Sequence, residues 1–242
     1  ALSTLREGWS LRRVWWFTAT ARTQARFART LFGSLWLGLS NLLSIAVLAL
    51  VYGTVFKVQD FNHYVVYLGV GLVVWNSLSG AISSAPNLFE HNAAHVHNTN
   101  MNPVFYVLEE WAFQIQTFLQ SFVLVIIALS FYQHDLFPRL LTVGLLPLLN
   151  FLLFIWWVPL IVCLLGSRYR DLYQLVPIVL QLIFLLSPIL YEKTNLGHLA
   201  WTADLNPLYQ VISPLRHALI YGDLQFRHSL VLLLANALGI IL

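Results

Sequence analysis

The sequence GSRYRDLYQLVPIVLQLIFLLSPILY (166–191) begins with a short basic turn and continues as an almost unbroken apolar run. The segment that follows, up to NPLYQVISPLR (206–216), mixes apolar, polar and proline residues. An apolar run of about 20 residues is long enough to cross a bilayer as a helix. The pattern therefore predicts a membrane crossing between a positively charged turn and a segment that only partly enters the bilayer.

The whole chain shares this apolar character, with 59% apolar and 10% charged residues and a mean hydropathy of +0.73. Such a composition cannot cover an aqueous surface with polar groups, so we expect an integral membrane protein. At 242 residues, the chain has room for about six spans and none for a soluble catalytic domain. Cys163 is the only cysteine, which excludes an intramolecular disulfide and a cysteine-based metal site.

Six apolar blocks follow one another along the chain, and they are continuous rather than alternating. Because an unpaired strand edge is not viable in lipid, we predict an all-α membrane protein with six transmembrane helices. The last block has only about 14 residues, so we expect the natural chain to continue beyond Leu242. The blocks are 31–56, 64–85, 105–132, 140–165, 172–191 and 229–242.

Basic residues are concentrated in the first 30 residues, where six arginines and one glutamate give a net charge of +5. Basic segments stay on the cytoplasmic side of a membrane, so we expect a cytoplasmic N-terminus. The loops then alternate, although several basic residues fall on the outer side. We expect 86–104 and 166–171 inside, and 57–63, 133–139 and 192–228 outside.

The N-terminal segment has the pattern of an amphipathic interfacial helix. Arg22, Arg26 and Arg29 have the spacing of one helix face, while Phe17, Phe27 and Leu31 fall roughly opposite. Arginine side chains at headgroup depth bind anionic lipids. The segment is therefore either a topology signal with a membrane-bound tail or a device that admits a charged, lipid-linked substrate.

The loop 86–103 is the longest on the predicted cytoplasmic side, and it contains His91, His95 and His97. Two histidines four residues apart on a helix can share a metal ion. Glu90 is the only nearby carboxylate, so a full ligand set is missing and we predict no metal site. A short helix between two prolines, exposed to the cytosol, favours a docking element instead.

The third and fifth blocks carry polar side chains that are unusual for membrane spans. Because such groups are costly in lipid, they should face a helix bundle, a polar cavity or the membrane boundary. In the third block they could equally be structural bonds between helices. The polar residues are Glu109, Glu110, Gln114, Gln116, Thr117, Gln120 and Ser121 in the third block, and Gln174 and Gln181 in the fifth.

Residues 192–228 favour two short helices that enter the outer leaflet and return. Each is too short to span, and such helices are tolerated only where they pack on protein or line water. Pro207 and Pro214 both suit helix starts.

Four motifs, taken together and in order, resemble the permease subunit of bacterial ABC-2 type polysaccharide exporters, a family that exports O-antigen, capsule, teichoic acid and related lipid-linked glycans. They are HNAAHVHNTN (91–100), GSRYRDL (166–172), LSPILY (186–191) and the segment 206–216. The resemblance covers residues 10–242. It implies a homodimer in the cytoplasmic (inner) membrane, with a channel between the subunits and two cytosolic ATPase subunits, and no nucleic-acid partner.

The resemblance also implies a division of the chain. Residues 1–30 would be the cytoplasmic interfacial helix, and 31–242 the six-span domain, with a coupling loop at 86–102 and outer re-entrant helices at 193–225. The expected ATPase contacts are Glu90, His91, Asn92, His95, His97 and Asn98. The loop lacks the basic residues that are usual in the family, so we expect less electrostatic docking.

Hydrolysis of ATP must take place in a partner, because no Gly-x-x-x-x-Gly-Lys-[Ser/Thr] occurs and neither lysine follows a glycine. We expect no cofactor in this chain, with ATP and magnesium bound by the partner. Aromatic rings can stack on the C–H faces of sugars, although aromatic residues also form interfacial belts. The candidate channel residues are Trp36, Tyr52, Tyr67, Trp75, Phe184 and Tyr191.

We expect Arg22, Arg26 and Arg29 to help admit the lipid pyrophosphate, and the turn Arg168, Tyr169 and Arg170 to contact the partner or the headgroups. The alternatives to glycan export are an ABC-2 exporter of a smaller lipid or drug, a histidine-dependent membrane metalloenzyme, and a passive structural membrane protein.

Overall fold

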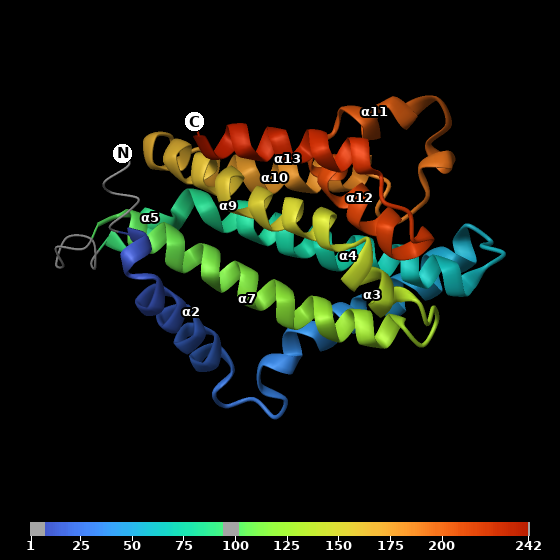
Figure 1. The fold of residues 1–242 in the computed structure, drawn as a ribbon, viewed down its shortest axis with the longest axis horizontal. Helices are drawn as coiled ribbons and strands as arrows, with labels where there is room; N and C mark the ends of the chain where they lie inside the picture. The colour runs from blue at the N-terminus through green and yellow to red at the C-terminus, as the bar shows by residue number, and fades with distance from the viewer. Residues whose placement is uncertain (1–7, 94–101, 242) are drawn as a thin grey trace.

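The computed structural model describes residues 8–93 and 102–241, and every regular element in these ranges is helical (Figure 1). The expected all-α class is confirmed, because continuous apolar blocks can satisfy their backbone hydrogen bonds only within helices.

Four helices are long and apolar enough to cross a membrane: α3 (Trp36–Val55), α4 (Phe61–Ser84), α7 (Val104–Leu129) and α9 (Leu145–Arg168). Two shorter apolar helices, α10 (Leu172–Leu186) and α13 (Phe226–Ile241), account for the fifth and sixth predicted blocks. The count of six transmembrane helices therefore stays a prediction.

Two blocks differ in extent from the prediction. The fifth is helical only to Leu186, because Ser187 takes an extended conformation before Pro188. The fourth is divided between α8 (Leu136–Thr142) and α9, which begins after Gly144.

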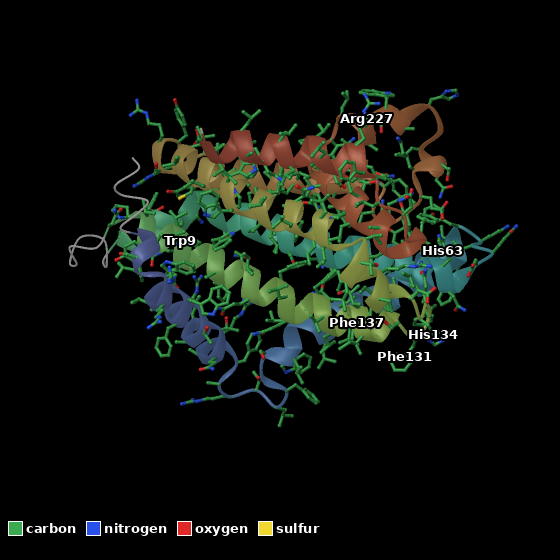
Figure 2. The ribbon with its side chains drawn as sticks, in the orientation of Figure 1. Trp9, His63, Phe131, His134, Phe137 and Arg227 are labelled. Atoms are coloured by element: carbon green, nitrogen blue, oxygen red, sulfur yellow. The ribbon has the colours of Figure 1, made fainter. Side chains whose placement is uncertain are left out.

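The connections alternate between the two ends of the bundle. Figure 1 places α5 (Leu88–His91) and the turn between α9 and α10 at one end, here called the α5 end. The connections from α3 to α4 and from α7 to α8 lie at the opposite end, the α8 end. Figure 2 shows His63 and His134 at the α8 end and Trp9 toward the other. This alternation agrees with the predicted loops, while the choice of cytoplasmic side stays a prediction.

The helix α4 forms the centre of the molecule. Every residue from Tyr64 to Trp75 is buried, and α4 contacts α3, α7, α9, α10 and α12. Its core neighbours include Phe118 and Phe122 of α7, whose rings stack at 4.9 Å between centroids. A helix that is apolar on all sides packs best in this central place.

The helix α2 (Arg12–Phe27) packs along the first half of α7 through Trp15, Ala19 and Thr23. The predicted division of α2 into faces is partly wrong. The helix ends at Phe27, so Arg29 is not on the same helix as Arg22 and Arg26. The small side chains of Ala19 and Thr23 allow α2 to approach α7 closely, so the face of α2 that carries them is the buried one.

The segment after Tyr191 forms η3 (Lys193–Leu199), α11 (Ala200–Leu205) and α12 (Pro207–Tyr221). The side chain of Asn206 caps α12 by accepting hydrogen bonds from the amides of Leu208 at 3.0 Å and Tyr209 at 3.3 Å. Pro207 therefore starts a helix as predicted. Pro214 lies inside α12, so that prediction was wrong.

Candidate functional site

A groove of about 510 Å³ lies between α4 and α10. Its lining contains aromatic rings, amides, hydroxyls and a proline, and none of the lining side chains carries a charge. The lining residues are Trp75, Asn76, Ser79, Gly80, Ser83, Pro177, Leu180, Gln181 and Phe184.

Two of the predicted channel aromatics meet in this groove. The ring centroids of Trp75 and Phe184 are 5.4 Å apart, with a tilt of 35° between the ring planes. Trp75 is buried and Phe184 half-buried, so the pair forms part of the wall rather than a free surface. Gln181 precedes Phe184 by one turn of α10 and faces the same groove.

The α4 wall is fixed by a chain of polar side chains across three helices. The amide of Asn76 donates to Asn41 Oδ1 at 2.7 Å, and the amide of Asn41 donates to Ser121 Oγ at 2.7 Å. Hydrogen bonds between helices hold their positions where few other polar partners are present. Asn76 therefore has a fixed orientation at the edge of the groove.

The α10 wall is packed lightly, and Leu180 is its only buried residue. Its far end is held by side chains of α4 and α12 that donate to backbone carbonyls beyond the helix. Tyr64 Oη donates to Leu190 O at 2.6 Å, and Tyr67 Oη donates to Pro188 O at 3.1 Å. Arg216 Nη1 donates to the same Pro188 carbonyl at 2.9 Å.

Three more predicted aromatics lie near this end of α10, and one does not. The rings of Tyr52 and Phe56 stack at 5.7 Å, and Phe56 contacts the ring of Tyr191 at 6.4 Å. Tyr67 reaches the carbonyl of Tyr191 at 3.2 Å. Trp36 lies at the opposite end of α3 from Tyr52, where its ring contacts Phe32 at 5.5 Å.

Of the predicted entry arginines, Arg22 is paired within the protein. Its Nη1 lies 2.6 Å from Glu110 Oε2 and 3.8 Å from Glu109 Oε1, and the guanidinium lies 4.2 Å from the centroid of the Phe113 ring. Arg26 and Arg29 are exposed. Glu109 and Glu110 were visible in the sequence as an acidic pair in the third block. Their charge could have predicted an ion pair with an arginine of the N-terminal helix, and this signal was missed.

Glu110 also joins α2 to the last residue of α4, Ser84. Gln114 Nε2 donates to Glu110 Oε1 at 2.8 Å, and Ser84 Oγ donates to the same atom at 3.3 Å. A cavity of about 360 Å³ beside this network is lined by Arg22, Ser84, Asn87, Leu88, His91, Asn92, Glu109 and Glu110. The cavity therefore connects α2, α5 and α7.

The predicted docking residues lie at the α5 end. Glu90 and His91 are exposed and Asn92 is half-buried, while His95, His97 and Asn98 lie outside the described residues. Within the described ranges, no group of three or more metal-ligating side chains has a suitable arrangement.

The basic turn Arg168, Tyr169 and Arg170 is exposed beside the same segment. Gly166 lies directly on η2 (Ala85–Asn87), where an added Cβ would be 2.5 Å from the Cα of Pro86. A glycine is needed for this approach, and it brings the basic turn next to α5.

Comparison with known proteins agrees with this arrangement. Residues 16–220 match the family described as ABC-2 type transporter. The chain is 26% identical over 212 residues to an O-antigen export system permease protein RfbA of Klebsiella pneumoniae, covering 86% of this chain and 81% of the relative. A second protein of the same name and organism is 25% identical over 216 residues, with the same coverage. The chain therefore belongs to the ABC-2 type transporter family and is a membrane component of a transporter.

Proposed function

We propose that this chain is the channel-forming permease subunit of an ATP-driven exporter of lipid-linked polysaccharide in a bacterial cytoplasmic membrane. The observation that carries the proposal is the uncharged groove between α4 and α10, with Trp75 and Phe184 in its wall. The names of the two relatives, both O-antigen export permeases, support the substrate class.

The chemistry of the groove suits a moving sugar polymer. Asn76, Gln181 and the serine hydroxyls can exchange hydrogen bonds with sugar hydroxyls, and the two rings offer apolar surface to C–H groups. Full charges would hold a polar chain at one place, whereas neutral donors and acceptors let it exchange partners as it advances. A lining without charges therefore favours passage over tight binding.

A second copy of the chain would complete the channel. The groove is open on one side, and the neighbouring surfaces of α3 and α10 are apolar and exposed, including Val47, Leu50, Ile178 and Leu182. In a homodimer these helices either face the partner or the lipid. Two cytosolic ATPase subunits would bind ATP and magnesium.

In this proposal the α5 end is cytoplasmic. The exposed residues Glu90 and His91, with Asn92, would contact the ATPase, and the turn around Tyr169 would contact the ATPase or the headgroups. Residues 1–30 would lie at the cytoplasmic interface and 31–242 form the transmembrane domain. The elements in 193–225 would be the outer re-entrant helices, with α12 packed on protein as such helices require.

The proposal is tested by purifying this subunit together with its partner ATPase and measuring ATP hydrolysis with and without lipid-linked glycan. We expect a stable complex whose hydrolysis the glycan stimulates. A complex that responds to a smaller lipid or drug but not to glycan would contradict the polysaccharide substrate. Failure to form any complex would contradict the transporter mechanism.

A matched pair of variants tests whether transport depends on the lining of the groove. Phe184→Ala removes a ring from the lining, whereas Phe137→Ala removes a ring of α8 that is exposed outside the groove. We expect the first variant to lower glycan-stimulated hydrolysis and cell-surface glycan, and the second to leave both near the level of the unchanged protein. Equal effects of the two substitutions would remove the groove from the pathway.

A further inference from the structure

Two adjoining cavities lie at the α8 end, beyond the groove between α4 and α10. The first has a volume of about 200 Å³ and the second about 470 Å³. Glu192 lines both of them, and the rings of His63 in the second and Tyr221 in the first are 5.8 Å apart. The two cavities therefore share one boundary at Glu192 and another at the His63–Tyr221 contact.

Arg216 forms the inner wall of the first cavity, and its side chain is almost fully buried, with 3% of the residue exposed. Its guanidinium lies 3.8 Å from the centroid of the Tyr67 ring, and Nη2 donates to Tyr209 Oη at 3.2 Å. In the described part of the chain, no carboxylate lies within 4.0 Å of it. Two of its five N–H groups have protein acceptors, the Pro188 carbonyl and the Tyr209 hydroxyl.

Glu192 provides a negatively charged hydrogen-bond acceptor on the wall of the same cavity. Among the described residues its carboxylate has no cation within 4.0 Å, and Thr194 Oγ1 lies at 3.5 Å. The neighbouring Lys193 is instead bound to Asp204, at 2.5 Å. The cavity thus has donors on the Arg216 wall and acceptors on the Glu192 wall, and these two charges do not pair with each other.

The second cavity continues this mixture of groups. It adds the carboxylate of Asp60, the amides of Gln59 and Asn195, and the rings of Phe56 and His63. Asp60 Oδ1 already accepts from the amide of His63 at 3.0 Å, which fixes the carboxylate at the start of α4. Phe56 also contacts Tyr191, so this cavity joins the aromatic residues that follow the end of α10.

We propose that these two cavities form a binding subsite for neutral sugar units at the exit of the pathway, an inference that rests on the proposed function. A sugar offers hydroxyls that both donate and accept, matching Arg216 and Glu192, and apolar C–H faces that match the tyrosine rings. An anion such as phosphate would be attracted by Arg216 but repelled by Glu192 in the first cavity, and in the second cavity Glu192 and Asp60 would repel it without a lysine or arginine in the lining. The first cavity is comparable in size with a single sugar ring.

The subsite has a consequence for transport. Sugar units that leave the uncharged groove would meet two hydrogen-bonding partners at the α8 end, the buried guanidinium of Arg216 and the exposed carboxylate of Glu192. Binding there would disfavour backward movement of the polymer between strokes of the ATPase. Arg216 would then position both the sugar and the Pro188 carbonyl at the end of α10.

Direct binding is measured by saturation-transfer difference NMR on the permease–ATPase complex in lipid nanodiscs. The probes are methyl glycosides of glucose, galactose, mannose, rhamnose and N-acetylglucosamine, with inorganic phosphate as competitor. We expect signal from at least one glycoside, and Glu192→Gln to weaken its binding about tenfold through loss of a charged acceptor. Asp223→Asn, an exposed carboxylate that lines neither cavity, is the matched control and should leave binding unchanged.

Glu192→Gln keeps the size of the side chain, so a folding failure is not expected. Ser213→Phe, which fills the first cavity from α12, provides a second test and should abolish the signal. Unchanged binding in both variants, no signal with any of the glycosides, or displacement of the glycoside by phosphate would overturn the subsite.

The same preparations separate this inference from the proposed function. If glycan stimulates hydrolysis in the unchanged complex but Glu192→Gln does not weaken glycoside binding, the exporter function is retained and the subsite is rejected. Binding that depends on Glu192, in a complex that does not respond to the polymer, would retain the subsite and reject polysaccharide export.

Discussion

The helices α7 and α10 are both apolar and both carry glutamines, yet they lie in opposite surroundings. On α7, Glu110, Gln116 and Ser121 are buried, and each has a side-chain partner on α2 or α3. On α10, Gln174 and Gln181 are exposed, and only Leu180 is buried. The same kind of polar residue therefore joins helices in one place and lines a groove in the other.

The difference follows from what packs beside each helix. A polar group within an apolar bundle is retained where it finds a partner or lines a hydrated space. The helix α7 has α2 along its first half and α3 along its second, so its polar side chains are used in the fold. The helix α10 faces α4 across the groove, and its Gln181 is exposed there instead of joining two helices.

The largest effect that we predict concerns the contact of α2 with α7. Trp15 is buried, its ring lies 6.1 Å from that of Trp111, and its Nε1 donates to Gly8 O at 3.2 Å. Trp15→Ala should lower the free energy of unfolding by about 3–5 kcal/mol, measured by denaturation in mixed micelles.

Phe17→Ala is the control for this prediction, because Phe17 lies on the same helix with 72% of its surface exposed. This substitution should lower the free energy of unfolding in micelles by no more than about 0.5 kcal/mol. Similar losses for Trp15→Ala and Phe17→Ala would show that α2 is not held on α7 by its Trp15 side.

A glutamine pair tests the comparison of α7 with α10 directly. Gln116 Nε2 donates to Thr20 Oγ1 at 3.1 Å and to Trp16 O at 3.3 Å, so Gln116→Ala should cost about 1–2 kcal/mol of stability. Gln181→Ala should leave stability unchanged to within about 0.5 kcal/mol. It should instead reduce glycan-stimulated ATP hydrolysis about two- to tenfold, the effect of one lost hydrogen bond.

The result that contradicts this pair is a reversal of the two effects. If Gln181→Ala destabilises the protein as much as Gln116→Ala, then α10 is packed more tightly than its exposure indicates. If Gln116→Ala slows transport without loss of stability, α7 takes part in the pathway.

The apolar blocks were sufficient to predict the helices, because a long apolar run in lipid has no alternative to helical hydrogen bonding. The pairing of Trp75 with Phe184 was also within reach, since both were candidates on spans predicted to line a channel. The split of the fourth block and the helical position of Pro214 were missed, because boundaries and internal prolines depend on tertiary packing.

The contacts of the arginines were harder to predict than the helices. The burial of Arg216 depends on Tyr67, Pro188 and Tyr209, which come from three different segments. For Arg22, the pattern on α2 indicated a lipid-facing cation, whereas the carboxylates of α7 provide a closer partner. Helix periodicity shows which residues share a face, and it does not show which neighbour will cover that face.

The smallest predicted effect separates the arginines of the N-terminal segment. The side chain of Arg22 is 47% exposed, so its pair with Glu110 is screened by solvent, and Arg22→Gln should cost about 1 kcal/mol of stability or less. Arg26→Gln, at an exposed position without an acidic partner among the described residues, should cost nothing measurable.

Transport distinguishes the two arginines in the opposite way. If free cations admit the lipid pyrophosphate, then Arg26→Gln and Arg29→Gln slow export at full stability, and added salt weakens the difference by screening. Arg22→Gln would act mainly by loosening α2 from α7, so a combination with Glu110→Gln should be less than additive in stability. Full export after loss of both Arg26 and Arg29 would remove these two cations from headgroup recognition and leave α2 the packing role that its contacts with α7 already show.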